Sequence, residues 1–267
     1  MKNGLAFLCF VMALFFVWDA FHSRAERVKV KHSRVLSDVV VLVMALWLLR
    51  GPENAYSSTA ISCLILGVVV LLGSTVSALR RNFDNIGLLV AGATCLFVVL
   101  DLSFGIVQFT VTDLLGRNMT FTDRVPLWNA LLELGLKRPL LGYGYGGFWT
   151  AERVSYTDGF FQGHNGYLEV FVQGGFVGIA LLGVLLTTVF KSIQRTGLRD
   201  YEFAVLRFTF FAAILLANVT ESSFASERDL LTFVFYIIAL NPNAPMRQQN
   251  SHIGLPARRK AEHHAVG

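Results

Sequence analysis

Two arginines and a histidine, all in one segment of the chain, are the residues best suited to chemistry. Arg117 and Arg124 lie seven positions apart, and His164 follows them. The planar guanidinium of arginine binds phosphate oxygens through paired hydrogen bonds and stays charged at any working pH, so the pair suits a diphosphate. The imidazole of His164 could accept a proton near neutral pH. The alternatives are arginines that reach lipid headgroups and a histidine that lies at a membrane interface.

The elements that must position these residues are apolar helices. Of 267 residues, 54% are hydrophobic and 15% are charged, against roughly a quarter charged in an ordinary soluble domain. A helix needs about 20 mainly apolar residues to cross a bilayer. The sequence therefore predicts an all-α fold, a polytopic transmembrane helix bundle of about seven spans. The predicted spans are 4–21, 35–49, 55–79, 86–109, 170–190, 203–220 and 229–240, the second and last being short enough to be tilted or re-entrant.

The net charge of +5 is better explained by membrane topology than by nucleic-acid binding. Cytoplasmic loops are enriched in Lys and Arg, and the opposite topology would place the basic cluster at 22–34 outside. We therefore predict an outer N-terminus. The chain then divides into four spans, a long extracytoplasmic loop, three closing spans and a disordered cytoplasmic tail, at 1–109, 110–169, 170–240 and 241–267.

The loop at 110–169 is the exception in this pattern, because connections longer than about 12–15 residues tend to be functional or disordered. It is rich in aromatic residues, so we expect it to be ordered, with an interfacial amphipathic helix at 124–137. Its glycine cluster follows no predicted strand and opens no βαβ unit, which argues against a nucleotide motif. We assign a role in shape, as a tight turn, to Gly142, Gly144, Gly146 and Gly147.

Carboxylates in or beside apolar segments are further candidates. An ionisable residue at membrane depth is a functional hypothesis by default, and Asp101 is such a residue. The alternative is that Asp101 pairs with an arginine of the loop. Glu221 begins the last outer turn and could complete the same outer cleft. The cysteines have no metal-ligand spacing, so no disulfide framework, metal site or cofactor is predicted, and packing is the expected role of Cys9, Cys63 and Cys95.

Five separate blocks of residues, in order, resemble the O-antigen ligase and polymerase family, most closely its exopolysaccharide polymerase branch. They are Gly-Arg-x-x-Thr-x-Thr-x-Arg-x-x-x-Trp (116–128), Arg-Pro-Leu-Leu-Gly-x-Gly (138–144), His-Asn-x-Tyr-Leu (164–168), Gly-Gly-Phe-Val-Gly-Ile (174–179) and Asn-x-Thr-Glu-Ser (218–222). Two features depart from the family pattern. Asp123 replaces the usual glycine before Arg124, and the chain looks like the C-terminal portion of a family member.

The resemblance implies a metal-independent membrane glycosyltransferase similar to the GT-C type, working without a cofactor. Its donor would be a glycan on undecaprenyl diphosphate, and its acceptor a sugar of a second repeat unit or of the lipid A core. Arg117 and Arg124 would bind the diphosphate, and His164 would position or deprotonate the acceptor. Supporting roles are assigned to Asp101, Asn165 and Glu221.

The implied location is the bacterial inner membrane, embedded in the lipid bilayer, with the active site on the periplasmic side. Other polysaccharide-assembly membrane proteins are candidate partners, and nucleic acid is not. Two other classes stay open. One is a truncated, inactive or regulatory membrane protein. The other is a transporter, which is disfavoured because the sequence shows no pair of matching interrupted spans.

Overall fold

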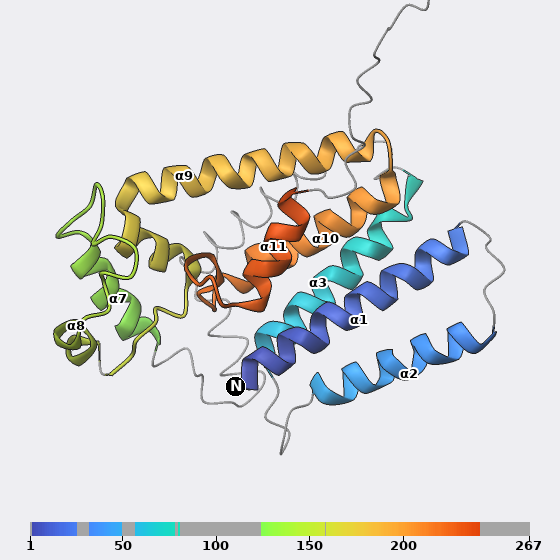
Figure 1. Cartoon of the computed structure of the whole chain (residues 1–267), viewed down its shortest axis with the longest axis horizontal. Helices are drawn as coiled ribbons and strands as arrows, with labels where there is room; N and C mark the ends of the chain where they lie inside the picture. Colours follow the sequence, from blue (N-terminus) through green and yellow to red (C-terminus); the bar gives the residue numbers. More distant parts are fainter. Residues whose placement is uncertain are drawn as a thin grey trace, which may run out of the picture.

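The computed structural model describes residues 2–25, 32–49, 57–77, 80, 124–157 and 159–240. Within these ranges the chain forms eight α-helices and one 3-10 turn, and no strand, which confirms the predicted all-α class there. The helices of the bundle are α1 (Lys2–Ala25), α2 (His32–Leu49), α3 (Ser58–Ser74), α9 (Gly166–Gly197), α10 (Tyr201–Ala217) and α11 (Leu230–Leu240). Two shorter helices, α7 (Arg124–Gly135) and α8 (Ala151–Tyr156), lie beside the start of α9 (Figure 1).

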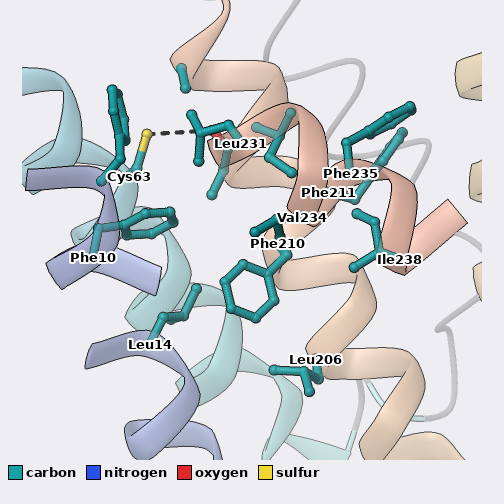
Figure 2. Close-up of a cluster of buried hydrophobic side chains, with 14 of the residues drawn as sticks. Phe10, Leu14, Cys63, Leu206, Phe210, Phe211, Leu231, Val234, Phe235 and Ile238 are labelled. Carbon is teal, nitrogen blue, oxygen red and sulfur yellow. Dashed lines mark hydrogen bonds between the residues drawn. The ribbon is translucent and has the colours of Figure 1, made fainter. Parts of the chain in front are cut away.

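Helix α10 is the centre of the bundle, and α3, α9 and α11 pack around it (Figure 1). Nearly every residue of α10 from Ala204 to Ala217 is buried. Aromatic and branched side chains from four helices meet there (Figure 2). The rings of Phe10 and Phe210 meet edge to face at 6.3 Å, and the Cys63 thiol donates to the Ala213 carbonyl at 3.3 Å. The all-round apolar surface that predicted a span at 203–220 is thus buried in protein.

Helices α1, α3 and α9 run in one direction and α2 and α10 in the other, so the starts of α3 and α9 lie at the same end of the bundle as the end of α10 (Figure 1). At the other end, the Tyr201 hydroxyl donates to the Ser74 carbonyl at 2.9 Å and the Trp18 indole donates to the Glu202 carbonyl at 3.0 Å. The topology itself stays a prediction. Among the basic residues predicted to lie inside, the structure describes Arg80 and those in and after the C-terminal part of α9.

The number of membrane crossings stays a prediction. By length and apolar composition, two of the described helical segments could cross a bilayer, Gly4–Phe21 and Gly166–Gly197. Three others are apolar but shorter: Asp38–Leu49, Thr59–Ser74 and Leu230–Leu240. At 1.5 Å per residue, the last is only about 16 Å long, roughly half the hydrocarbon thickness. The span predicted at 86–109 lies outside the described residues, as do Cys95 and the tail at 241–267, while Cys9 and Cys63 are buried packing residues as expected.

Helix α9 is broken near its start, which the apolar pattern at 170–190 did not reveal. Gly175 has φ 62° and ψ −158°, a conformation outside the helical region. The chain changes direction there, and a short first segment leads into the long one (Figure 1). Two helical hydrogen bonds are lost at the break. It frees the carbonyls of Val172 and Gln173 and the amides of Phe176 and Val177.

The glycine-containing loop 138–144 replaces both lost bonds. The Tyr143 and Gly144 amides donate to the two freed carbonyls at 2.9 and 2.8 Å, and the Pro139 and Leu140 carbonyls accept from the two freed amides at 2.7 and 3.1 Å. A side chain at Gly142, whose φ is +63°, would come within 2.5 Å of the backbone of α9. The cluster therefore serves shape, because the Gly144 and Gly146 amides donate to Gln173 of α9 and the Gly142 and Gly147 amides donate to carbonyls within the loop.

Candidate functional site

Arg124 is the first residue of α7, and it links that helix to the bundle. Its guanidinium Nη1 donates to the Thr220 carbonyl at 3.0 Å, in the turn that follows α10. The hydroxyl of Thr220 lies 2.8 Å from that of Thr59, in the first turn of α3. The end of α10 and the starts of α3 and α7 are thereby held together around Arg124. This is the outer end of the bundle in the predicted topology.

His164 lies immediately before α9, in an unusual backbone conformation. Its φ of 46° is in the left-handed region, which side chains other than glycine adopt uncommonly. The side-chain Nε2 of Gln162 is 3.3 Å from both ring nitrogens of His164. The ring of Phe160 meets the imidazole edge to face, with the ring centroids 6.1 Å apart. The half-buried imidazole is therefore held on two sides by its own loop.

The electrostatic environment favours the neutral imidazole. Burial lowers the pKa of His164 from its ordinary value of 6.5, and the positive charge of Arg124 lowers it further. An unprotonated ring nitrogen is what a general base needs at neutral pH. Arg124 and the residue after His164 also bond to the same turn after α10, through the Thr220 carbonyl and the Ser222 hydroxyl. The structure thus brings together two of the three residues expected to do chemistry.

Asn165 caps helix α9 through its side chain. Its Oδ1 accepts hydrogen bonds from the Tyr167 and Leu168 amides at 3.0 and 3.1 Å, and its own amide donates to the Ser222 hydroxyl at 3.2 Å. The Gly166 amide donates to the Asn218 carbonyl at 2.8 Å. The geometry gives Asn165 a capping role that fixes the residue after His164, because its amide oxygen is already used by two backbone donors.

Glu221 adjoins Thr220 and is buried, with 8% of its surface exposed. Its amide donates to the Ala217 carbonyl at 2.8 Å, which continues α10 into the turn that carries Thr220. Glu221 is therefore in the same turn that anchors Arg124. Arg117 and Asp101 lie outside the described residues, and their predicted roles stay predictions.

A second, small apolar core supports this end of the molecule. The predicted helix at 124–137 is present as α7, and its buried face is made by Leu127, Leu131 and Leu134. These side chains pack on Phe148 of the loop and on Phe171 of α9. Leu132 and Leu136, also near helical spacing, are exposed. The outer-loop segment that carries the site residues is thus held by its own small apolar core.

Sequence reasoning missed Glu169, in the first turn of α9. This carboxylate is 3% exposed and accepts hydrogen bonds from the Gly163 amide, the Trp149 indole and the Gln173 side chain. Acidic residues are common in the first turn of any helix, so the residue type gave no signal. The available signal was its place one helical turn after the capping Asn165, beside the loop that ends at His164.

The chain belongs to the O-antigen ligase family, whose description matches residues 34–183, more than half of its 267 residues. This confirms the resemblance, and the matched range contains Arg117, Arg124, His164 and Asn165. The family consists of O-antigen ligases and polymerases, which are membrane-embedded enzymes of glycosyltransferase type. Glu221 lies outside the matched range.

One curated relative is the exopolysaccharide production protein ExoQ of Rhizobium meliloti (strain 1021). It is 29% identical to this chain over 157 residues, which cover 53% of this chain. The match covers 35% of that protein, so the chain spans about a third of the relative's length. The similarity agrees with the exopolysaccharide branch suggested by the motifs.

Proposed function

We propose that this chain takes part in glycan transfer in a bacterial inner membrane, moving a glycan from undecaprenyl diphosphate to an acceptor sugar during O-antigen or exopolysaccharide assembly. The site is the end of the bundle where Arg124 and His164 meet, facing the periplasm. The observation that carries the proposal is that, in a member of this family, Arg124 and the residue after His164 both bond to the turn after α10.

The reaction requires the protein to stabilise the charge of the leaving diphosphate and to accept the proton of the acceptor hydroxyl. An acceptor hydroxyl attacks the anomeric carbon of the donor while the bond from that carbon to the diphosphate oxygen breaks. The leaving lipid diphosphate carries negative charge, which Arg124 stabilises together with Arg117. The hydroxyl proton passes to the ring nitrogen of His164, which the lowered pKa keeps unprotonated. No step needs a nucleotide or a metal ion.

The remaining residues position these two groups. Thr220 holds the guanidinium of Arg124 through its carbonyl, and Glu221 adjoins it. Asn165 fixes the start of α9 directly after His164. Asp101 is proposed to complete the cleft from the segment before the loop. The acceptor decides between polymerase, with a second lipid-linked repeat unit, and ligase, with the lipid A core.

The broken helix α9 raises the transporter alternative again, because transporters bind ions at such breaks. Here the four freed backbone groups are all bonded to the loop 138–144. They are therefore committed to protein contacts instead of a transported ion. This favours glycan transfer over transport.

Complementation of a host that lacks its own polysaccharide polymerase tests the proposal. The wild-type chain, Arg124→Ala, Arg124→Lys and His164→Asn are compared at matched membrane levels, and the glycan is separated on a gel. Arg228→Ala is the control, since Arg228 is an exposed arginine on the connection between α10 and α11. We expect long chains with the wild type and the control, none with Arg124→Ala, and few with Arg124→Lys, which cannot form the paired bonds.

His164→Asn retains a side chain that tolerates the left-handed conformation while it removes the titrating ring. We expect a loss on the order of 10²-fold or more in chain formation, as for other general bases. Unchanged glycan with Arg124→Ala would contradict the diphosphate role. An inserted wild-type chain that restores no glycan would favour the alternative of a non-catalytic membrane protein.

A further inference from the structure

The carboxylate of Glu169 lies where three segments of the outer loop meet. Its Oε2 accepts from the Gly163 amide at 2.7 Å. Its Oε1 accepts from the indole N–H of Trp149 and, at 2.9 Å, from the side-chain amide of Gln173. With 3% of its surface exposed, the residue has little access to water. Three donors thus converge on two oxygens, an arrangement that suits a carboxylate, which only accepts.

The two peptide groups on either side of the Gly163 Cα are each held by one hydrogen bond. The N–H of Gly163 is bound by Glu169, and its carbonyl accepts from the Trp128 indole of α7 at 2.9 Å. A side chain at position 163 would come within 2.8 Å of the Glu169 carboxylate and 2.9 Å of Leu131. The next residue is His164, in its left-handed conformation. The two peptide groups that lead into this left-handed residue are therefore both restrained, one by Glu169 and the other by Trp128.

The same carboxylate reaches the broken helix. Gln173, which donates to Glu169, also accepts from the Gly146 amide at 3.1 Å through Oε1. This fixes the amide orientation of Gln173, because its nitrogen and its oxygen each have a matching partner. Trp149 adds the loop after the glycine cluster. One buried group thus connects the histidine turn, the glycine loop and α9.

We propose that Glu169 is a positioning residue for His164: by binding the backbone N–H of Gly163 it keeps the imidazole at the site. The inference rests on the proposed base role of His164 and names a residue on which that role depends. A strained backbone conformation persists only where the surroundings enforce it. The Glu169 network is one part of these surroundings that acts directly on the backbone before His164, and the Trp128 bond is another.

Glu169→Gln tests this with minimal change of shape. A glutamine can offer one accepting oxygen, and its NH2 must face a donor, so at least one of the three bonds is lost. The matched control is Glu133→Gln on α7, whose exposed carboxylate pairs with Lys137 at 3.5 Å and with the Tyr156 hydroxyl at 3.1 Å. Transfer rates are measured on membranes with a lipid-linked donor at saturating and limiting concentrations.

We expect Glu169→Gln to lower kcat roughly ten- to hundredfold, as small displacements of a reacting group do, with little change in KM for the donor. In a His164→Asn background the same substitution should change the rate less than about twofold, because the two residues act as one unit. Glu133→Gln should have no effect in either background. Equal losses in both backgrounds would overturn the inference and make Glu169 a general stabilising residue.

Carbethoxylation of His164 supplies a readout that does not depend on activity. Diethyl pyrocarbonate reacts with accessible, unprotonated imidazole, and mass spectrometry of the full chain in detergent gives the rate at pH 7, with the other histidines as internal reference. We expect His164 to react several-fold faster in Glu169→Gln and at the wild-type rate in Glu133→Gln. An unchanged rate would overturn the inference by itself. Normal transfer by His164→Asn would instead contradict the proposed base role. The carbethoxylation rate of His164 would then decide whether Glu169 positions the imidazole.

Discussion

At the scale of single residues, the site is defined by what surrounds His164 as much as by the imidazole itself. Its backbone is left-handed, its ring contacts Gln162 and Phe160, and its charge state responds to Arg124. Each of these contacts restrains the ring or keeps it neutral. In the proposed role of base, a ring held in this way would need no large rearrangement to accept a proton.

The lowered pKa of His164 predicts the pH dependence of transfer. The proposed base must be unprotonated, so the rate is complete at neutral pH and falls only as the pH drops below 6.5, through the lowered pKa. Arg124→Gln removes the second cause of that shift. Although the variant is slower overall, its acid limb should move to higher pH. Rate profiles normalised to their maxima check this, and a limb that moves to lower pH would contradict the assignment.

Asn165 predicts a stability effect that is separable from chemistry. Asn165→Ala removes the acceptor for two backbone amides of α9 and should destabilise the chain by about 1 kcal/mol. Asn165→Asp keeps the acceptor and should be close to the wild type. Thermal unfolding in detergent compares the two. Equal destabilisation by both variants would show that the amide nitrogen, and not the cap, is what matters.

The types of these residues could be predicted from the sequence, but their partners could not. His164 and Arg124 were found because spacing and motif order marked them. The capping bonds of Asn165 are local, but its backbone amide also donates to Ser222, which is distant in the sequence, and one donor to Glu169 is Trp149 of the loop. Trp149 reaches Glu169 only because the loop folds back on α9. Such contacts depend on tertiary packing, which cannot be predicted directly from one amino-acid sequence.

At the scale of elements, the break in α9 and the loop that fills it form one unit. Gly175→Ala is predicted to destabilise it severely. Its φ of +62° is unfavourable for alanine by about 1–2 kcal/mol, and the new Cβ would clash with the Leu140 carbonyl. Gly174→Ala is the matched control, since its Cβ would meet nothing within 4 Å. Unfolding in detergent and limited proteolysis of the loop measure the difference, and equal stability of the two variants would contradict it.

Alanine variants at Gly142 and Gly144 distinguish the effect of backbone strain from that of close packing against α9. Gly142 and Gly144 both have positive φ, +63° and +85°, but only a Cβ at Gly142 would meet the backbone of α9. Gly142→Ala should therefore be clearly less stable than Gly144→Ala in the same unfolding assay. If both alanine variants lost the same stability, conformational strain alone would explain these glycines and the close approach would be irrelevant.

Apolar periodicity found the helices, because burial and lipid exposure leave a pattern over many residues. It gave α7 close to its observed bounds, Arg124–Gly135 against 124–137. It could not find the break at Gly175, because the apolar run continues through it and only the pair Gly174-Gly175 marks the place. The loop that satisfies the break was predicted as a turn. The hydrogen bonds of this loop to α9 could not be predicted from the sequence and are seen only in the structure.

At the scale of the whole molecule, the site occupies one end of the bundle and a different kind of residue secures the other. Arg207 of α10 is 1% exposed. Its guanidinium donates to the Ile238 carbonyl in the last turn of α11, at 2.9 and 2.6 Å from Nε and Nη2. It also donates to the Thr196 and Ser192 hydroxyls of α9, at 2.6 and 3.1 Å. From the sequence, Arg207 was only an arginine within a span.

We therefore predict that substitution of Arg207 lowers the stability of the whole chain without a direct effect on glycan transfer. Arg207→Met keeps an unbranched, apolar side chain but leaves the acceptors on α9 and α11 without their donors, which should cost about 3 kcal/mol or more. The control is Thr209→Val, since the buried Thr209 hydroxyl donates only within α10, to the Val205 carbonyl at 2.7 Å. Arg207→Lys should fall between them, because an ammonium group cannot span both helices as the planar guanidinium does.

Thermal unfolding of purified chains gives the order of stability, and glycan transfer per folded molecule gives the effect on the site. We expect Arg207→Met to unfold well below the wild type and Thr209→Val to stay near it, with transfer per folded molecule unchanged in both. Arg124 and Thr220, by contrast, should affect transfer more than unfolding, since they lie at the other end of α10. If Arg207→Met abolished transfer while its unfolding matched that of the wild type, the separation between a stabilising end and a reacting end would be wrong.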